Sequence, residues 1–308
     1  MRAIMLMFDS LNRHMLPPYG GTFVQAPNFQ RLARRSVVFD NFRAGSLPCI
    51  PARRELHTTP DIQGHDLAQI LDHDGEIRSG ALFDIHGGHV NVTDGRYVYM
   101  RSCTGPANAP LEEHTLMPTH MRSRFDPDEL AEWQPCEPFS FTKGLRTMRI
   151  PTSAGWLSSW RHGTLLFDLR EDAHQQQPLD DPDVELRMLH LLTSLLRESD
   201  APTSQFERLD LPHDRAPGPE HLLVAEHAAR AAEIAEPLPR EQDLPPAATT
   251  PVGELLGNNA ARAALERHLP EICRTETLGL PPTTTLLDLA RHAVISAATL
   301  RALADELG

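Results

Sequence analysis

Apolar residues are spaced in two distinct ways in the first two thirds of the chain, and both patterns predict strands. Residues 4–8 form a short continuous apolar run, which is typical of a strand buried on both faces. Later segments are short, rich in Val, Tyr and Phe, and bounded by polar turns, which favours antiparallel strands. The Asp94-Gly95 pair predicts a tight hairpin turn. The predicted strands are 4–8, 37–39, 81–83, 89–93, 97–100 and 165–169.

A repeat of apolar residues every three or four positions predicts helices elsewhere. Residues 26–35 follow this pattern, with Pro27 in the first turn and Phe29, Leu32 and Ala33 on one face. A clear amphipathic stretch runs from Val184 to Arg197. Another helix is expected to open at Pro51, and further helices are predicted over 222–234, 252–256, 260–269 and 285–307.

The charge of the chain excludes some partners. The chain has 308 residues and a formal net charge of −13, which argues against a general nucleic-acid binder or a protein that binds anionic membranes. Residues 1–60 run against this trend, because they hold eight arginines and only three acidic residues. This basic segment is either a solvated helix face or a pocket for a small anion.

Cysteine spacing and hydropathy point to an intracellular setting. The four cysteines, Cys49, Cys103, Cys136 and Cys273, form no CxxC pair, which argues against a zinc site or a disulfide framework. The apolar opening stops at Asp9 without a cleavage site for a signal peptide, and no run of about 20 apolar residues follows. We therefore expect a cytoplasmic protein without membrane association.

One short motif carries candidate chemistry. Cys49, Pro51 and Arg53 fit the pattern C-x-P-x-R, after a β-α-β opening that places Asp9 at the end of the first strand. With these residues the chain resembles the sulfatase family, of the alkaline-phosphatase-like fold. Residues 8–14, 26–29 and 44–46 look like the N-terminal region of that family, and residues 86–97, 117–121 and 163–169 look like its C-terminal subdomain.

The resemblance implies a mechanism for residues of this chain. A separate formylglycine-generating enzyme would oxidise Cys49 to formylglycine, whose hydrate is a geminal diol. One hydroxyl would attack the sulfur of a sulfate ester, and the sulfated intermediate would then expel sulfate and restore the aldehyde. Arg53 would hold the diol and the sulfate oxygens. Asp9 and the modified Cys49 would bind a calcium ion that acts as a Lewis acid.

Other residues are candidates for supporting roles. Arg13 and Arg54 are candidate anion contacts near the motif. His86 and His89 flank two glycines, so they either approach a ligand or shape a turn at the edge of a strand.

The resemblance also divides the chain, with one departure from the family. Residues 60–64 look like a segment just before the C-terminal subdomain, so the long central section of the family is missing. We expect an α/β fold: a truncated parallel sheet of the alkaline-phosphatase type, an antiparallel C-terminal subdomain and a helical tail. The expected divisions are 1–62 (βα segment with the motif), 63–212 (C-terminal subdomain), 213–250 (Pro-rich linker with a helix) and 251–308 (helical tail).

Two kinds of function follow from this interpretation. The first is an enzyme, a sulfuric ester hydrolase acting on anionic small molecules or glycans, with phosphate or phosphonate esters as an alternative substrate class. The second is an inactive, internally shortened relative that serves as a binding or assembly module. Residues 251–308 offer no catalytic constellation and would serve packing, or the assembly of a homo-oligomer.

Overall fold

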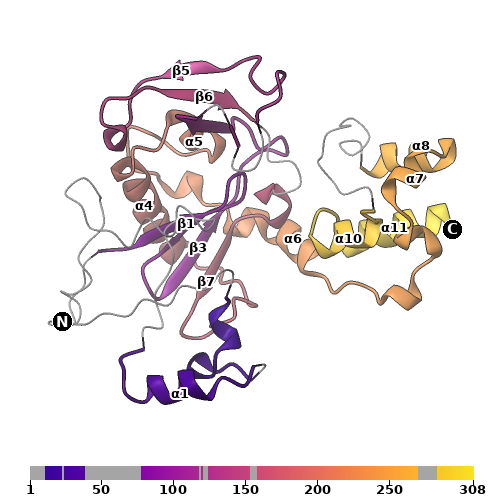
Figure 1. Ribbon diagram of the computed structural model, residues 1–308, viewed down its shortest axis with the longest axis horizontal. Coiled ribbons are helices and arrows are strands. Elements are labelled where there is room, and N and C mark those ends of the chain that lie inside the picture. The colour runs from indigo at the N-terminus through magenta and orange to yellow at the C-terminus, as the bar shows by residue number, and fades with distance from the viewer. Residues whose placement is uncertain are drawn as a thin grey trace.

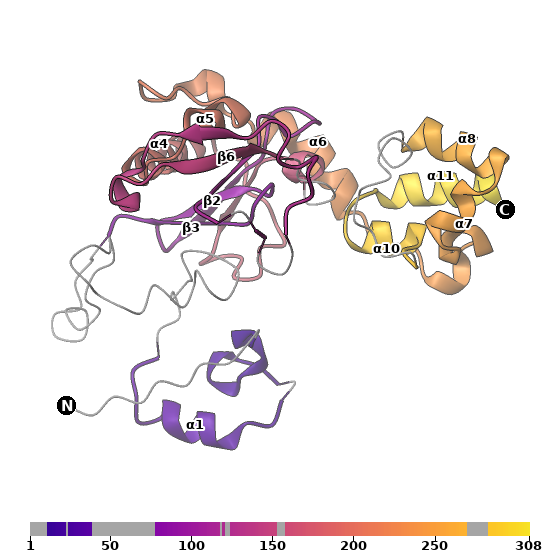
Figure 2. The same cartoon turned by 45° about the horizontal axis from the view of Figure 1, so that its top comes forward.

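The protein is a mixed α/β structure with two antiparallel sheets (Figure 1). The computed structural model describes residues 11–22, 24–38, 78–117, 119–120, 124–152, 158–269 and 283–308. Figures 1 and 2 show the sheets gathered in one body and the C-terminal helices in another, with helix α6 between them.

The first sheet confirms the predicted antiparallel strands. Its order is β1-β2-β3-β7, and every neighbouring pair is antiparallel. The hairpin between β2 and β3 turns at Asp94, whose carboxylate accepts bonds from the backbone N–H of Arg96 (2.9 Å) and Tyr97 (2.7 Å). Gly95 has φ +94°, a conformation that glycine adopts without strain. The strands are Ala81–Asp84, Val90–Thr93, Tyr97–Arg101 and Leu165–Asp168.

The second sheet was not predicted. Strands β4 (Glu112–Thr115), β5 (Gln134–Cys136) and β6 (Thr147–Pro151) are antiparallel in the order β4-β6-β5. The β4 sequence Glu-Glu-His-Thr and the β5 sequence Gln-Pro-Cys contain no alternation of apolar and polar residues. Without that alternation, the sequence pattern gives no signal for a strand.

The parallel sheet of the expected fold is absent from the described part of the chain, where all paired strands are antiparallel. The predicted strand 4–8 and the helix expected to open at Pro51 lie outside the described residues. Val37 and Val38 belong to no strand, so the prediction for 37–39 is wrong for these two residues. Antiparallel order is expected here, since tight connections such as the β2–β3 hairpin cannot join parallel strands.

Helix α4 (Pro182–Glu198) covers one face of the first sheet, and a hydrophobic core forms between the helix and the sheet. Asp181 caps the helix by accepting bonds from the N–H groups of Asp183 and Val184. The short helix α5 (Thr203–Arg208) adds Phe206. The fully or nearly fully buried members of this core are Val90, Val92, Tyr99, Leu166, Met188, Leu189, Leu192, Leu196, Phe206, Leu209, Leu211 and Val224.

A buried carboxylate fixes helix α6 (Val224–Ala235) against this core. Glu185 on α4 is only 3% exposed, and its Oε1 accepts bonds from the N–H groups of Leu223 (2.8 Å) and Val224 (3.2 Å). Helix α6 has no side-chain cap of its own, so Glu185 supplies the cap from another helix. Tyr99 on β3 donates to the same oxygen at 3.2 Å.

The C-terminal helices enclose a separate core. Helices α7 (Val252–Leu256) and α8 (Asn259–His268) lie close to their predicted bounds. The single helix predicted over 285–307 is wrong: the chain forms α10 (Leu286–Arg291) and α11 (Ala297–Leu307). Ala293 between them has φ +54°, and Ser296 caps α11 by accepting the N–H of Thr299. A left-handed residue ends a helix, and a serine cap begins the next one.

The segment between the two cores contributes to both. Val224 packs in the core of the first sheet, whereas Leu244 and Ala248 pack with the C-terminal helices. Within the segment, α6 confirms the predicted helix, and two short 3₁₀ turns follow it at Glu241–Asp243 and Pro246–Thr249. Arg301 on α11 also forms an ion pair with Glu236, at the end of α6, at 3.5 Å.

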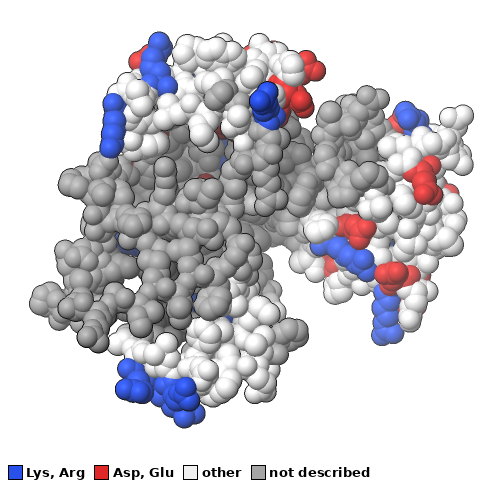
Figure 3. All heavy atoms as spheres, in the orientation of Figure 1, with Lys and Arg blue, Asp and Glu red and all other residues white. Residues whose placement is uncertain are grey.

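The basic N-terminal helix α1 (Pro27–Ala33) confirms the element predicted over 26–35, but it buries no residue. Leu32 is 57% exposed, so the predicted apolar face is not covered at that position. Arg31, Arg34 and Arg35 are exposed, which favours the solvated-face interpretation for these three arginines. Figure 3 shows arginine side chains without acidic ones on the visible face of this segment.

We predict that Glu185→Leu destabilises the protein by about 2–4 kcal/mol, because it leaves three donors without their acceptor. Glu198 lies on the same helix but is exposed, and Ser194 donates to it. The matched control Glu198→Leu should therefore change stability by less than about 0.5 kcal/mol. Urea unfolding of the two variants checks this, and equal effects would show that Glu185 does not fix α6.

Candidate functional site

The structure describes only some of the residues that the sequence nominates. Asp9, Cys49, Arg53 and Arg54 lie outside the described residues. Arg13 begins a 3₁₀ turn at Arg13–Met15, and its guanidinium lies 5.8 Å from the centre of the Tyr19 ring. The other two candidates, His86 and His89, lie in the turn that joins β1 to β2. That turn and its surroundings form the candidate site.

Two buried polar residues hold the His86–His89 turn in place. Asn108 donates from Nδ2 to the carbonyl of Gly87 (2.7 Å), and its Oδ1 accepts from Arg208 Nη1 (2.7 Å). Arg208, only 2% exposed, is held in turn by the side chain of Gln205 (3.0 Å). Gly87 has φ +75°, so the turn favours glycine at this position. These contacts support the turn-shaping interpretation of the histidine pair.

A single peptide group lies between two histidines. His89 Nε2 lies 2.8 Å from the carbonyl oxygen of Gly163, and the N–H of Thr164 donates to His227 Nδ1 at 3.0 Å. The carbonyl of Gly163 and the N–H of Thr164 belong to the same peptide bond. Both its polar groups are therefore satisfied by imidazole rings, one from the start of β2 and one from α6. We call this arrangement the histidine clamp.

The hydrogen bonds of the clamp define the form of each ring. A carbonyl only accepts, so His89 carries a proton on Nε2. His227 accepts at Nδ1, so its neutral form carries the proton on Nε2. The pKa of both histidines is lowered to about 4, chiefly by burial, and for His227 the charges of Arg230 and Arg101 contribute to the lowering. At neutral pH both rings are uncharged and bind main chain, so they position β7 and are weak bases.

Aromatic and cationic groups surround the clamp. The His162 ring lies 5.8 Å from that of His89, and burial lowers the pKa of His162. Trp160 packs edge-on to His227 at 6.3 Å, and the Arg230 guanidinium lies 3.6 Å from the centre of the Trp160 ring. A cation over an indole face is stabilised by the ring quadrupole.

His86 lies apart from the clamp, near Asp84, Glu113 and Arg208. Burial lowers the pKa of His86 and raises that of Asp84, while the charge of Arg208 counteracts the rise for Asp84. Within the described ranges no group of three or more His, Cys, Asp or Glu side chains could hold a metal ion. The residues implied for calcium, Asp9 and Cys49, lie outside those ranges.

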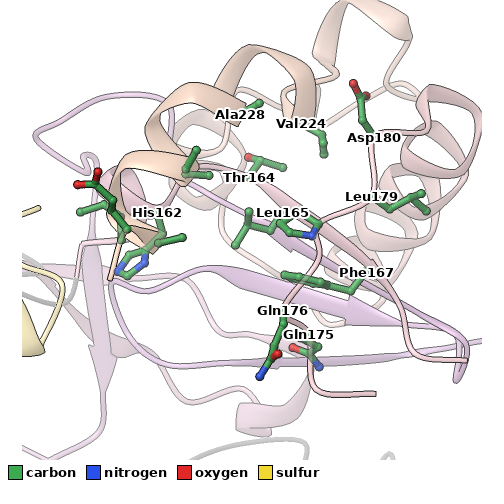
Figure 4. Close-up of a pocket in the computed structure, with 16 residues that line it drawn as sticks. His162, Thr164, Leu165, Phe167, Gln175, Gln176, Leu179, Asp180, Val224 and Ala228 are labelled. Atoms are coloured by element: carbon green, nitrogen blue, oxygen red, sulfur yellow. The ribbon is translucent and has the colours of Figure 1, made fainter. Parts of the chain in front are cut away.

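An apolar groove of about 610 Å³ opens beside the clamp, between β7, residues 175–180 and α6 (Figure 4). Leu165 and Phe167 line it from β7, Leu179 lines it from residues 175–180, and Ala228 and its neighbours line it from α6. His162 and Thr164 lie at the wall next to the clamp. A volume of this size suits a small ligand.

Sequence patterns did not reveal most of these residues. Asn108, Arg208, His227 and Arg230 lie far apart along the chain and in no recognisable motif. His227 sits on the buried face of an alanine-rich helix, where a histidine resembles any residue that fills a core. A buried arginine such as Arg208 reads in sequence as an ordinary surface charge.

No known family, curated protein or solved structure matches this chain. In the ranges that the structure covers, no helix has both the length and the apolar character needed to cross a membrane.

The clamp predicts an acid-sensitive fold. The pKa of His227 is about 4 in the folded chain and about 6.5 when unfolded, so between these values the unfolded chain binds more protons. Stability therefore falls as pH drops from 6.5 to 4, by at most about 1.4 kcal/mol per pH unit for one histidine. His227→Asn keeps an acceptor near Nδ1 without titrating, so urea unfolding across pH 4–7 should show a shallower slope. An unchanged slope would contradict this role of His227.

Gly163 is predicted to be intolerant of a side chain. Its φ is +65° with ψ −178°, a region used almost only by glycine, and an added Cβ would lie 2.8 Å from the His227 Cβ. We expect Gly163→Ala to cost about 3 kcal/mol, from strain and steric overlap.

Gly95→Ala is the matched control for that substitution. Gly95 also has positive φ, but nothing lies within 4 Å of an added Cβ, so only strain of about 1 kcal/mol is expected. Thermal unfolding compares the two variants, and equal losses would show that contact with His227 adds nothing.

Proposed function

We propose that the chain is a sulfatase-type hydrolase that cleaves sulfate esters through a formylglycine made from Cys49. The observation that carries this proposal is the C-x-P-x-R motif of Cys49, Pro51 and Arg53, placed after a segment that ends its first apolar run at Asp9. Pro51 suits the first turn of a helix, and a helix N-terminus favours the anion that develops as the ester is cleaved.

The fold around the histidine clamp supports the proposal at a coarser level. The resemblance implies an antiparallel C-terminal subdomain, and the described body contains such a sheet covered by α4. The stretch 163–169, which carries part of the resemblance, contains β7 and the residues directly beside it. In this proposal the sheet body is scaffold: its neutral histidines hold the main chain, while the reacting groups come from residues 1–62.

The alternative is a catalytically inactive binding or assembly module. One observation favours it: both histidines of the clamp bind main chain, and Asn108 binds the Gly87 carbonyl in the His86–His89 turn. The missing central section also removes the stretch that supplies further catalytic groups in the family. Phosphate and phosphonate esters remain a substrate alternative within the enzyme proposal, because tetrahedral anions suit similar clamps.

The proposal predicts that Cys49 determines activity. The chain is co-expressed with a formylglycine-generating enzyme, and peptide mass spectrometry tests whether the Cys49 thiol has become an aldehyde. Modified protein should release sulfate from an aryl sulfate when calcium is supplied, and Cys49→Ala should abolish that release. Cys103→Ala is the control, since Cys103 is buried in the sheet body and has no part in the motif.

The outcomes of this experiment distinguish the hydrolase from the inactive binding module. Aryl phosphate or phosphonate cleaved in place of aryl sulfate would change the substrate class but keep the enzyme. Folded protein with modified Cys49 and no turnover of any of these esters would refute the hydrolase proposal and leave the binding module.

A further inference from the structure

Arg230 on α6 differs from Arg96 and Arg101 because two of its N–H groups have no acceptor. Two of its nitrogens, Nε and Nη2, are buried and have no hydrogen-bond partner. These two N–H groups point the same way from one edge of the guanidinium plane. Buried donors are almost always paired in folded proteins, and a buried charge without partners is costly. The edge is therefore a place where an acceptor is expected.

Other arginines show what this edge does when it is paired. Arg96 uses Nε and Nη2 to bind the carboxylate of Asp168 at 3.0 and 2.7 Å. Arg101, fully buried, uses the same two atoms to bind the carbonyl of Leu209 at 3.1 and 2.8 Å. For Arg230, no carboxylate of the described residues comes within ion-pair distance.

The surroundings of Arg230 favour a negatively charged acceptor. Trp160 stacks on the guanidinium face, with the guanidinium 3.6 Å from the centre of the ring, so a ligand bound in the guanidinium plane would not compete with the ring. The pKa of Arg230 is lowered by burial, and Glu226 offsets this only in part. Arg101 and Arg230 both depress the pKa of His227 by their charge, so a second arginine lies on this side of α6. The Arg230 side chain as a whole is half-buried, but Nε and Nη2 themselves are closed to solvent, so an oxyanion reaches them only when neighbouring side chains shift.

We propose that the Nε–Nη2 edge of Arg230, stacked on Trp160, binds a small oxyanion. The ligand presents two oxygens in one plane, as carboxylate, sulfate and phosphate do, and each oxygen accepts one N–H. This site rests on α6 and Trp160 and does not depend on Cys49 or on the proposed hydrolase.

The test is isothermal titration calorimetry of the folded chain with sodium sulfate, sodium phosphate and sodium acetate. Sodium chloride keeps the ionic strength constant across the titrations. All proteins carry Arg53→Ala, which removes the sulfate contact of the proposed active site. Saturable binding is expected for at least one of the three salts, and the preferred salt identifies the class of oxyanion. Arg230→Met should abolish the binding, and Arg230→Lys, which keeps the charge without the paired donors, should weaken it about tenfold or more.

Arg301→Met is the matched control. Arg301 is a half-exposed arginine whose ion pair with Glu236 is already made, so the variant should bind as the parent does. Absence of saturable binding in the parent, or equal binding by the Arg230→Met variant, would overturn the proposal. If Arg230→Met fails to fold, Arg230→Lys alone decides: undiminished binding refutes the paired-donor site, because a lysine cannot reproduce the guanidinium edge.

Discussion

The carboxylate of Glu185 is the constraint on which the rest of the sheet body depends. It joins three elements at one oxygen: α4, which carries it, β3 through Tyr99, and α6 through the N–H groups of Leu223 and Val224. Arg101 extends the network, because its Nη1 donates to Tyr99 Oη (3.2 Å) and to the carbonyl of His221 (2.6 Å). A buried carboxylate is stable only when its lone pairs are used. The network therefore allows little freedom in where α6 begins.

The position of α6 in turn decides what surrounds β7. Three turns of the helix place His227 against the Gly163–Thr164 peptide, Arg230 over Trp160, and a row of small side chains along the groove. Strand β7 is at an edge of its sheet, where unpaired main-chain groups normally invite another strand. His227 binds the N–H of Thr164, directly before the strand, and the N–H of Leu179 donates to the carbonyl of Leu166 at 2.7 Å. The helix thus protects the edge while leaving a groove beside it.

The sequence predicted those elements that are determined by residues close together along the chain. The β2–β3 hairpin was predicted because Asp94 and Gly95 fix a turn locally, and α4 because its leucines recur at helical spacing. The second sheet was not predicted because its strands are short and polar. The break after Arg291 was not predicted because alanine, at position 293, does not indicate a left-handed turn. His89 was nominated by its glycines, but its role depends on Gly163, 74 residues away. Pairings of that kind have no signature in a single sequence.

The histidine clamp and Arg230 illustrate opposite ways of treating a buried polar group near the same helix. His89 and His227 stay neutral, and each gains a main-chain partner, so the fold itself accounts for their presence. Arg230 stays charged, since a guanidinium does not lose its proton in the accessible pH range, and the described residues give its inner edge no acceptor. The clamp is complete without a ligand, whereas the arginine is not. That asymmetry separates the residues that build this body from the one that points to something bound by it.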